Sequence, residues 1–136
     1  MATLDTNVLI RYLTQDDPGL AARAFALLEQ VEEGSRSVLL LEGVLVEAVQ
    51  VLVSRRLYNV SREVIRTRLR YIIGLAHVEL TNKRVYLDAL DIFVDFPRLS
   101  FVDALCAAHA QRSRDRTVIS FDRGFRDLPG VRWEEP

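Results

Sequence analysis

The chain has 136 residues, of which 49% are hydrophobic, and its formal net charge is −1. This length suits one domain, and the hydrophobic content supplies a core and excludes a disordered chain. No apolar run is long enough to span a membrane, and the amino terminus lacks the basic-then-apolar pattern that is typical of a signal peptide. We therefore expect a single domain over residues 1–136 in a cytoplasmic protein.

Basic charge is concentrated in one segment. Lys83 is the only lysine among the 18 basic residues. The segment Arg55–Arg70 is rich in arginine and contains a single acid, Glu63. A solvated helix face accounts for this pattern, and a phosphate-binding surface is the alternative.

The first third of the chain predicts one strand and two helices. Thr3–Thr6 is expected to form a short buried strand. Asn7 is the predicted N-cap of a helix over Val8–Thr14. A second helix is capped by Asp17, has proline at its first position and ends at Gly34.

The rest of the chain continues the alternation of short apolar runs and amphipathic segments. The further predicted strands are Ser37–Leu41, His77–Leu80, Thr117–Ser120 and Val131–Trp133. The further predicted helices are Gly43–Arg56, a helix from Ser61 to Gly74, one from Thr81 or Asn82 to Asp95, Phe101–Arg112, and a short helical turn at Asp122–Phe125. Single strands separated by helices predict an α/β fold, a three-layer α/β/α sandwich around a short, mainly parallel central sheet.

Four acidic residues occupy positions that such a topology brings together. Asp5 and Asp122 each follow a predicted strand, and the carboxyl ends of parallel strands meet at one edge. Glu47 and Asp103 lie on helices that border the same edge. Clustered carboxylates repel one another unless a cation neutralises them. Because these ligands are all oxygens, they favour Mg²⁺ or Mn²⁺ over zinc.

Each acid also has a simple structural explanation. Asp5 could help to cap the first helix, and Asp122 could be a turn residue. Ser100 and Asp103 have the spacing of a capping box. Glu47 could face solvent on its helix. Caps and turns are common uses of these residue types, so these explanations stay open.

By their order and spacing along the chain, four short stretches resemble motifs of the PIN-domain family, and within it of the VapC-type toxins of toxin–antitoxin pairs. They are Leu4–Leu9 (LDTNVL), Val46–Leu52 (VEAVQVL), Leu99–Leu105 (LSFVDAL) and Val118–Phe125 (VISFDRGF). Each motif is short and degenerate, and together they span nearly the whole chain.

The resemblance implies a set of site residues. Its acidic quartet, catalytic and metal-binding, corresponds to Asp5, Glu47, Asp103 and Asp122. Its supporting polar residues correspond to Thr6, Asn7 and Ser120. Glu42 is a rival for the glutamate position, and Glu47 fits the family spacing better. From their places in the sequence, Arg11 and Arg123 are candidate phosphate contacts, and Cys106 is expected to be a small core residue.

The resemblance also implies an activity and partners. The expected protein is a PIN-like endoribonuclease that hydrolyses RNA phosphodiesters with Mg²⁺ or Mn²⁺. It would be the toxin of a pair with a small antitoxin protein, and a homodimer. A catalytically silent PIN-like module that binds RNA or protein is the alternative. A flavodoxin-like receiver or phosphatase domain needs a lysine near the last strand, and Lys83 is badly placed for that role.

Overall fold

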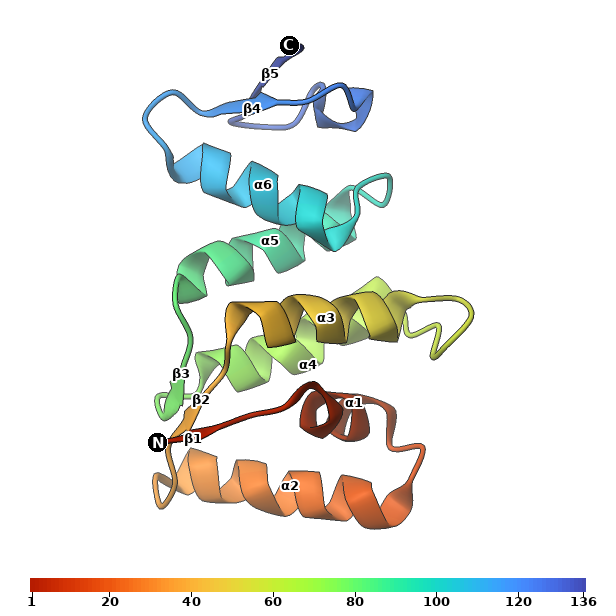
Figure 1. The fold of residues 1–136 in the computed structure, drawn as a ribbon, viewed down its shortest axis with the longest axis vertical. Helices are drawn as coiled ribbons and strands as arrows, with labels where there is room; N and C mark the ends of the chain where they lie inside the picture. The colour runs from red at the N-terminus through yellow and green to blue at the C-terminus, as the bar shows by residue number, and fades with distance from the viewer. The chain divides into compact units, whose positions relative to one another are not determined.

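A computed structural model describes all 136 residues, and the chain divides into two compact units (Figure 1). The N-terminal unit is Met1–Lys83 and the C-terminal unit is Arg84–Pro136. The element order agrees with the predicted one, a strand followed by two helices three times over and then two strands. None of the helices combines the length and apolar character that a bilayer crossing requires.

The N-terminal unit contains three short strands and four helices. They are β1 (Ala2–Thr3), α1 (Thr6–Thr14), α2 (Pro18–Glu33), β2 (Val38–Leu39), α3 (Glu42–Val53), α4 (Arg62–Gly74) and β3 (Val78–Glu79). The three strands form a parallel sheet in the order β1-β2-β3. Ladder hydrogen bonds continue beyond the strands, since the Leu4 amide donates to the Leu39 carbonyl at 2.9 Å and the Leu40 amide to the Glu79 carbonyl at 2.8 Å. The carboxyl ends of all three strands therefore lie at one edge of this sheet.

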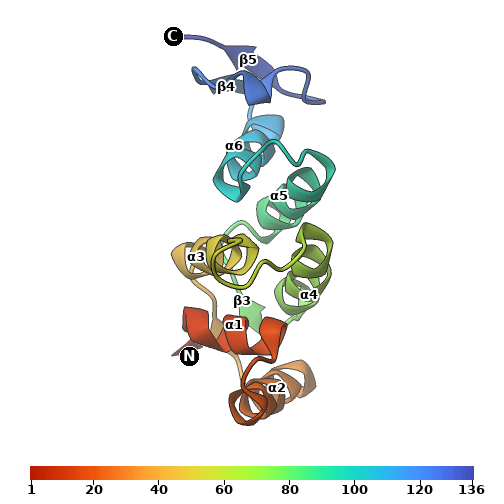
Figure 2. The same cartoon turned by 90° about the vertical axis from the view of Figure 1, so that its right-hand side faces the viewer.

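Helix α1 packs against both α2 and α3, and α3 packs against α4 (Figures 1 and 2). Their apolar faces form the core of the N-terminal unit. Fully buried members include Leu9, Val31, Leu45, Leu52, Ile65 and Ile72. The apolar residues of α3 and α4 are thus largely internal, and the large hydrophobic side chains of α4 that stay exposed are Val64 and Tyr71, each 40% exposed.

Three predicted helix boundaries in the N-terminal unit are confirmed. Asp17 accepts a hydrogen bond from the Leu20 amide at 3.0 Å, as an N-cap does. Ser61 caps α4 in the same way. Gly34 ends α2 with a left-handed φ of 82°, which glycine adopts without a steric penalty.

The predicted start of α1 is wrong. The helix begins at Thr6, and Asp5 is the N-cap residue in place of Asn7. The backbone carbonyl of Asp5 accepts from the Val8 amide at 3.1 Å, which closes the first turn two residues early. Because Asp and Asn are both good N-caps, the sequence pattern did not distinguish the two positions.

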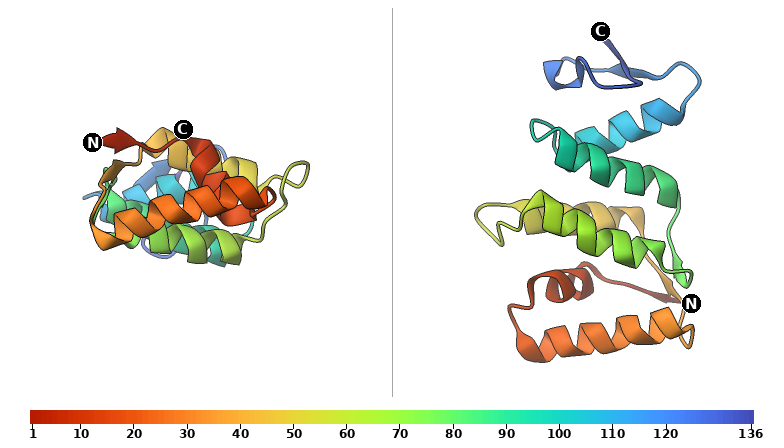
Figure 3. Two further views of the ribbon diagram at one scale, coloured as in Figure 1. Left: turned by 90° about the horizontal axis from the view of Figure 1, so that it is seen from below. Right: turned by 180° about the vertical axis from the view of Figure 1, so that it is seen from behind.

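The C-terminal unit contains α5 (Lys83–Asp95, with its first residue at the unit boundary), α6 (Phe101–Arg112), β4 (Thr117–Ile119), the 3₁₀ turn η1 (Arg123–Phe125) and β5 (Arg132–Glu134) (Figure 3). Strands β4 and β5 pair in parallel, with Val118 opposite Trp133. Phe93 and Phe101 join α5 to α6 in an edge-to-face contact at 5.5 Å.

The predicted α/β class, with short parallel sheets and six helices, is confirmed. The first four predicted strands are longer than the observed ones, since most ladders span only two residues, whereas the last is observed at Arg132–Glu134, one residue later than predicted. Apolar residues beyond each ladder, such as Leu4, Leu40 and Leu80, are still buried. Buried residues therefore continue beyond the hydrogen-bonded part of each strand. An apolar run in the sequence indicates which residues are buried, and it does not give the length of the paired strand.

Candidate functional site

Asp5 leaves the sheet at the carboxyl end of β1. It has extended backbone geometry and makes no side-chain capping hydrogen bond to α1. Its side chain is exposed. The explanation of Asp5 as a capping side chain therefore does not hold, and its carboxylate remains available to a ligand.

Thr6 connects this strand end to α3. Its hydroxyl donates to Glu47 Oε2 at 2.7 Å. Thr6 is only 9% exposed and is the one buried polar residue of the core. Glu47 is thus held by the residue next to Asp5. Glu42 instead lies in the first turn of α3, where the helix dipole stabilises a negative charge. This contact supports Glu47 for the glutamate position.

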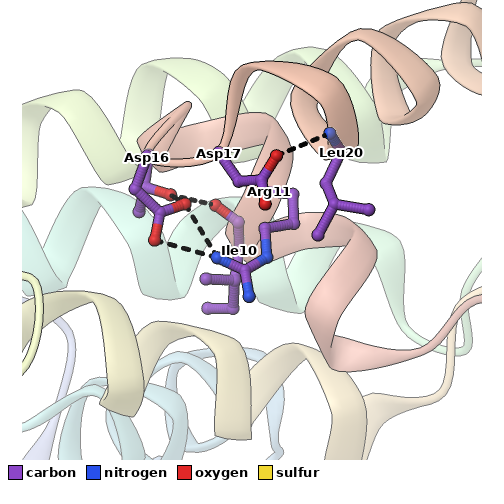
Figure 4. Close-up of polar contacts among 6 residues, drawn as sticks. Ile10, Arg11, Asp16, Asp17 and Leu20 are labelled. Carbon is purple, nitrogen blue, oxygen red and sulfur yellow. Dashed lines mark hydrogen bonds and ion pairs between the residues drawn. The ribbon is translucent and has the colours of Figure 1, made fainter.

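Asn7 is exposed on α1 and lines an open groove of about 390 Å³ between α1 and α2. Arg11 lines the same groove, but its Nη1 donates to both carboxylate oxygens of Asp16 at 2.9 Å (Figure 4). This hydrogen bond raises the pKa of Arg11. The pKa of Asp16 is lowered, first by the Thr14 hydroxyl, which donates to it at 2.8 Å, and then by Arg11. A phosphate at Arg11 would compete with this internal carboxylate.

Asp103 serves the helix that carries it. Its amide donates to Ser100 Oγ at 3.1 Å, and its Oδ2 accepts from the Ser100 amide at 3.1 Å. The two contacts form the capping box that the spacing predicted. Only Oδ2 is engaged by the box, so Oδ1 of the half-buried Asp103 can still meet a ligand.

Asp122 is held by a tight turn after β4. Its Oδ1 accepts from the Gly124 amide at 2.7 Å. Ser120 Oγ accepts from the Asp122 amide at 2.9 Å, and the Ser120 carbonyl accepts from Trp133 Nε1 at 2.8 Å. Ser120 thus fixes the backbone that presents Asp122. Asp122 is thus a turn residue, as the structural explanation proposed. Its side chain is exposed, and its Oδ2 atom makes no hydrogen bond within the turn.

Cys106 does not lie in the core, contrary to the prediction. It is exposed on α6, while Ala107 and Ala108 beside it are buried. Partial burial, followed by the negative charge of Asp103, raises the pKa of the Cys106 thiol. The Ala-rich sequence hid the helical phase, because apolar residues occur on every side of α6.

The four acids are divided equally between the units. Asp5 and Glu47 belong to the N-terminal unit, and Asp103 and Asp122 belong to the C-terminal unit. Neither unit alone gathers three side chains of the kinds that hold a metal ion. The donor set is made only of carboxylate oxygens, with at least one free oxygen at Asp5, Asp103 and Asp122, and this chemistry fits a hard divalent cation.

Two supporting residues were missed from the sequence. Arg98 donates through Nε to the Gly124 carbonyl at 2.9 Å and through Nη2 to the Arg126 carbonyl at 3.0 Å. Trp133 supports Ser120 from β5. Both act on the turn that carries Asp122. An arginine after Pro97 has the pattern of an ordinary loop residue, so no sequence signal distinguished it.

The sequence profile of the PIN domain family matches residues 2–131. The chain therefore belongs to the PIN domain family. PIN domains are in general nucleases and usually use divalent metals, so the fold is that of a nuclease class. No curated protein matches the chain in sequence.

Proposed function

We propose that the protein is a metal-dependent endoribonuclease that hydrolyses RNA phosphodiesters. The observation that carries the proposal is the arrangement at the end of β1. Asp5 has a carboxylate that no helix cap uses, and the buried Thr6 hydroxyl fixes Glu47. The buried Thr6 hydroxyl needs an acceptor in any case, and here the acceptor is a second carboxylate, held by the residue next to Asp5.

The four acids would hold Mg²⁺ or Mn²⁺, with Asp5 and Asp103 as the main ligands. When bound, such a cation supplies a lowered water pKa and positive charge for the transition state. Glu47 would orient the attacking water, and Thr6 keeps its carboxylate in place. Ser120 does the same for Asp122 through the backbone.

We also propose the toxin role, a small antitoxin partner and a homodimer, as the likeness to VapC-type toxins implies. Exposed apolar side chains on and before α4 support a partner surface. They include Leu57, which is 62% exposed, with Val64 and Tyr71. Light scattering at micromolar concentration tests the dimer, and a monomer without any partner would contradict it.

The test of the activity is cleavage of labelled single-stranded RNA by the purified protein in Mg²⁺ and in EDTA. Asp5→Asn should lower the cleavage rate by at least about a hundredfold, because outer-shell partners of metal ligands alone contribute 10- to 100-fold. Glu42→Gln is the matched control, since it removes one carboxylate of the same unit outside the proposed site and should leave the rate unchanged. Wild-type cleavage by Asp5→Asn protein would refute the site.

The silent-module alternative gives a different result. Such a protein would bind RNA or a partner protein, and neither wild type nor variants would cleave in Mg²⁺ or Mn²⁺. RNA binding without cleavage in either metal would favour that alternative.

A further inference from the structure

Three arginines line one pocket of the C-terminal unit. A pocket of about 400 Å³ in the C-terminal unit is lined by Phe96, Arg98, Arg123, Arg126 and Asp127. The lining thus contains three arginines and one acidic residue. No ion pair joins Asp127 to any of the three arginines, and three arginines against one aspartate give the pocket lining a net positive charge.

The local backbone places two of these arginines together. Arg123 opens η1, and the Arg126 amide donates to the Arg123 carbonyl at 3.0 Å. Arg126 follows the turn with extended backbone, and both arginines line the pocket, while Arg123 directly follows Asp122.

Arg98 is preorganised in the same pocket. Its Nε and Nη2 donate to the carbonyls of Gly124 and Arg126, and its guanidinium lies 5.2 Å from the centre of the Phe96 ring. These contacts fix the guanidinium plane before any ligand arrives, while its remaining N–H groups can still donate. Arg126 is restrained too, at 5.7 Å from the Trp133 ring.

We propose that Arg98, Arg123 and Arg126 form a subsite for a backbone phosphate of the RNA substrate, next to the phosphate that is cleaved. The proposal rests on the endoribonuclease function above and adds to it how the substrate strand is held. Guanidinium forks match phosphate oxygens, and preorganised arginines lose little side-chain entropy on binding. Because it reads only the backbone, this subsite binds RNA without sequence preference.

The test measures binding of a short, fluorescently labelled single-stranded RNA by anisotropy, in EDTA, over a range of salt concentrations. Arg123→Ala should weaken binding about tenfold, as expected for one charge-assisted hydrogen bond. The slope of log affinity against log salt should flatten by about 0.7, the value for one phosphate contact with a single strand. The double variant Arg123→Ala/Arg126→Ala should flatten it about twice as much.

Two controls separate this subsite from general charge and from folding. Arg114→Ala removes one exposed arginine of the same unit, outside the pocket, and should leave affinity and slope unchanged. Arg123→Lys keeps the charge and should retain the slope. Thermal melts of the Arg123 variants should match wild type, because that side chain makes no hydrogen bond or ion pair.

The outcomes distinguish the two proposals. If wild type cleaves RNA in Mg²⁺ but Arg123→Ala and the double variant bind as wild type does, the subsite is overturned and the nuclease function stands. If the arginine variants lose affinity as expected but no protein cleaves in Mg²⁺ or Mn²⁺, the subsite stands and the nuclease function fails. If wild type binds no RNA, the subsite is overturned.

Discussion

Replacing Thr6 by valine removes one hydroxyl and keeps the shape of a buried side chain. The lost contact is the 2.7 Å hydrogen bond to the Glu47 carboxylate. A hydrogen bond to a charged group contributes about 1.5 to 3 kcal/mol. Because the Glu47 side chain is exposed and water can replace the hydroxyl, we expect a loss of only about 1 to 1.5 kcal/mol. For a chain of this size, the melting temperature should fall by about 3 to 6 °C.

Thr6→Val should lower activity more than this stability loss explains. Without the hydroxyl, Glu47 is no longer held in place. At a temperature where the variant is still folded, its rate of RNA cleavage in Mg²⁺ should be about 10- to 100-fold lower than that of wild type. The assay pairs a thermal melt in EDTA with a labelled-RNA cleavage time course. Thr67→Val is the matched control, since the Thr67 hydroxyl donates only to the Glu63 carbonyl on an exposed part of α4. Wild-type cleavage and melting by Thr6→Val protein would refute the role given to this contact.

Further predictions concern stability in the N-terminal unit. Hydrogen bonding to Glu32 raises the pKa of Tyr71 to about 12 from 10.0, so the contact stabilises the fold below pH 10 and is lost as the pH rises from 10 to 12. Tyr71→Phe should therefore lower the free energy of unfolding at pH 9 by at most about 1 kcal/mol, because the pair is exposed. In circular dichroism melts, the difference in melting temperature between wild type and variant should disappear by pH 12. Gly34→Ala should destabilise by about 1 to 2 kcal/mol, because φ is +82° and the new Cβ would lie 2.8 Å from His77 Nε2. Gly43→Ala in α3, with nothing within 4 Å of the new Cβ, should instead stabilise by about 0.5 to 1 kcal/mol in urea unfolding, and equal effects at the two glycines would contradict this reasoning.

The presence of the helices and most of their capping residues could be predicted from the local sequence. Ser61, Asp17 and Ser100 each stand before an apolar periodic segment, and each caps the helix predicted there. The start of α1 did not follow, since Asp5 and Asn7 are both suitable caps and the choice depends on where the strand ends. The first four strands were also predicted too long, because backbone pairing depends on partner strands that are distant in the sequence.

The places of the candidate acids on their strands and helices were predictable, whereas their contacts were much less so. Parallel topology gave the positions of Asp5 and Asp122 at strand ends. The choice of Glu47 over Glu42 came from the family resemblance, and the Thr6 hydrogen bond now supports it. The clamp formed by Arg98 could not be predicted, because it joins residues 26 and 28 positions apart through backbone carbonyls, which carry no sequence signature.

The capping box at Asp103 has a consequence for how this chain can change over time. Its Oδ2 holds the start of α6, so losing an oxygen acceptor there weakens the helix as well as any metal site. Asp5 carries no such second duty, since its side chain caps nothing. In a copy released from selection for RNA cleavage, Asp5 should therefore drift first while an acceptor persists at 103. Under the proposed nuclease function, Asp5 is therefore the acid whose replacement costs the fold least.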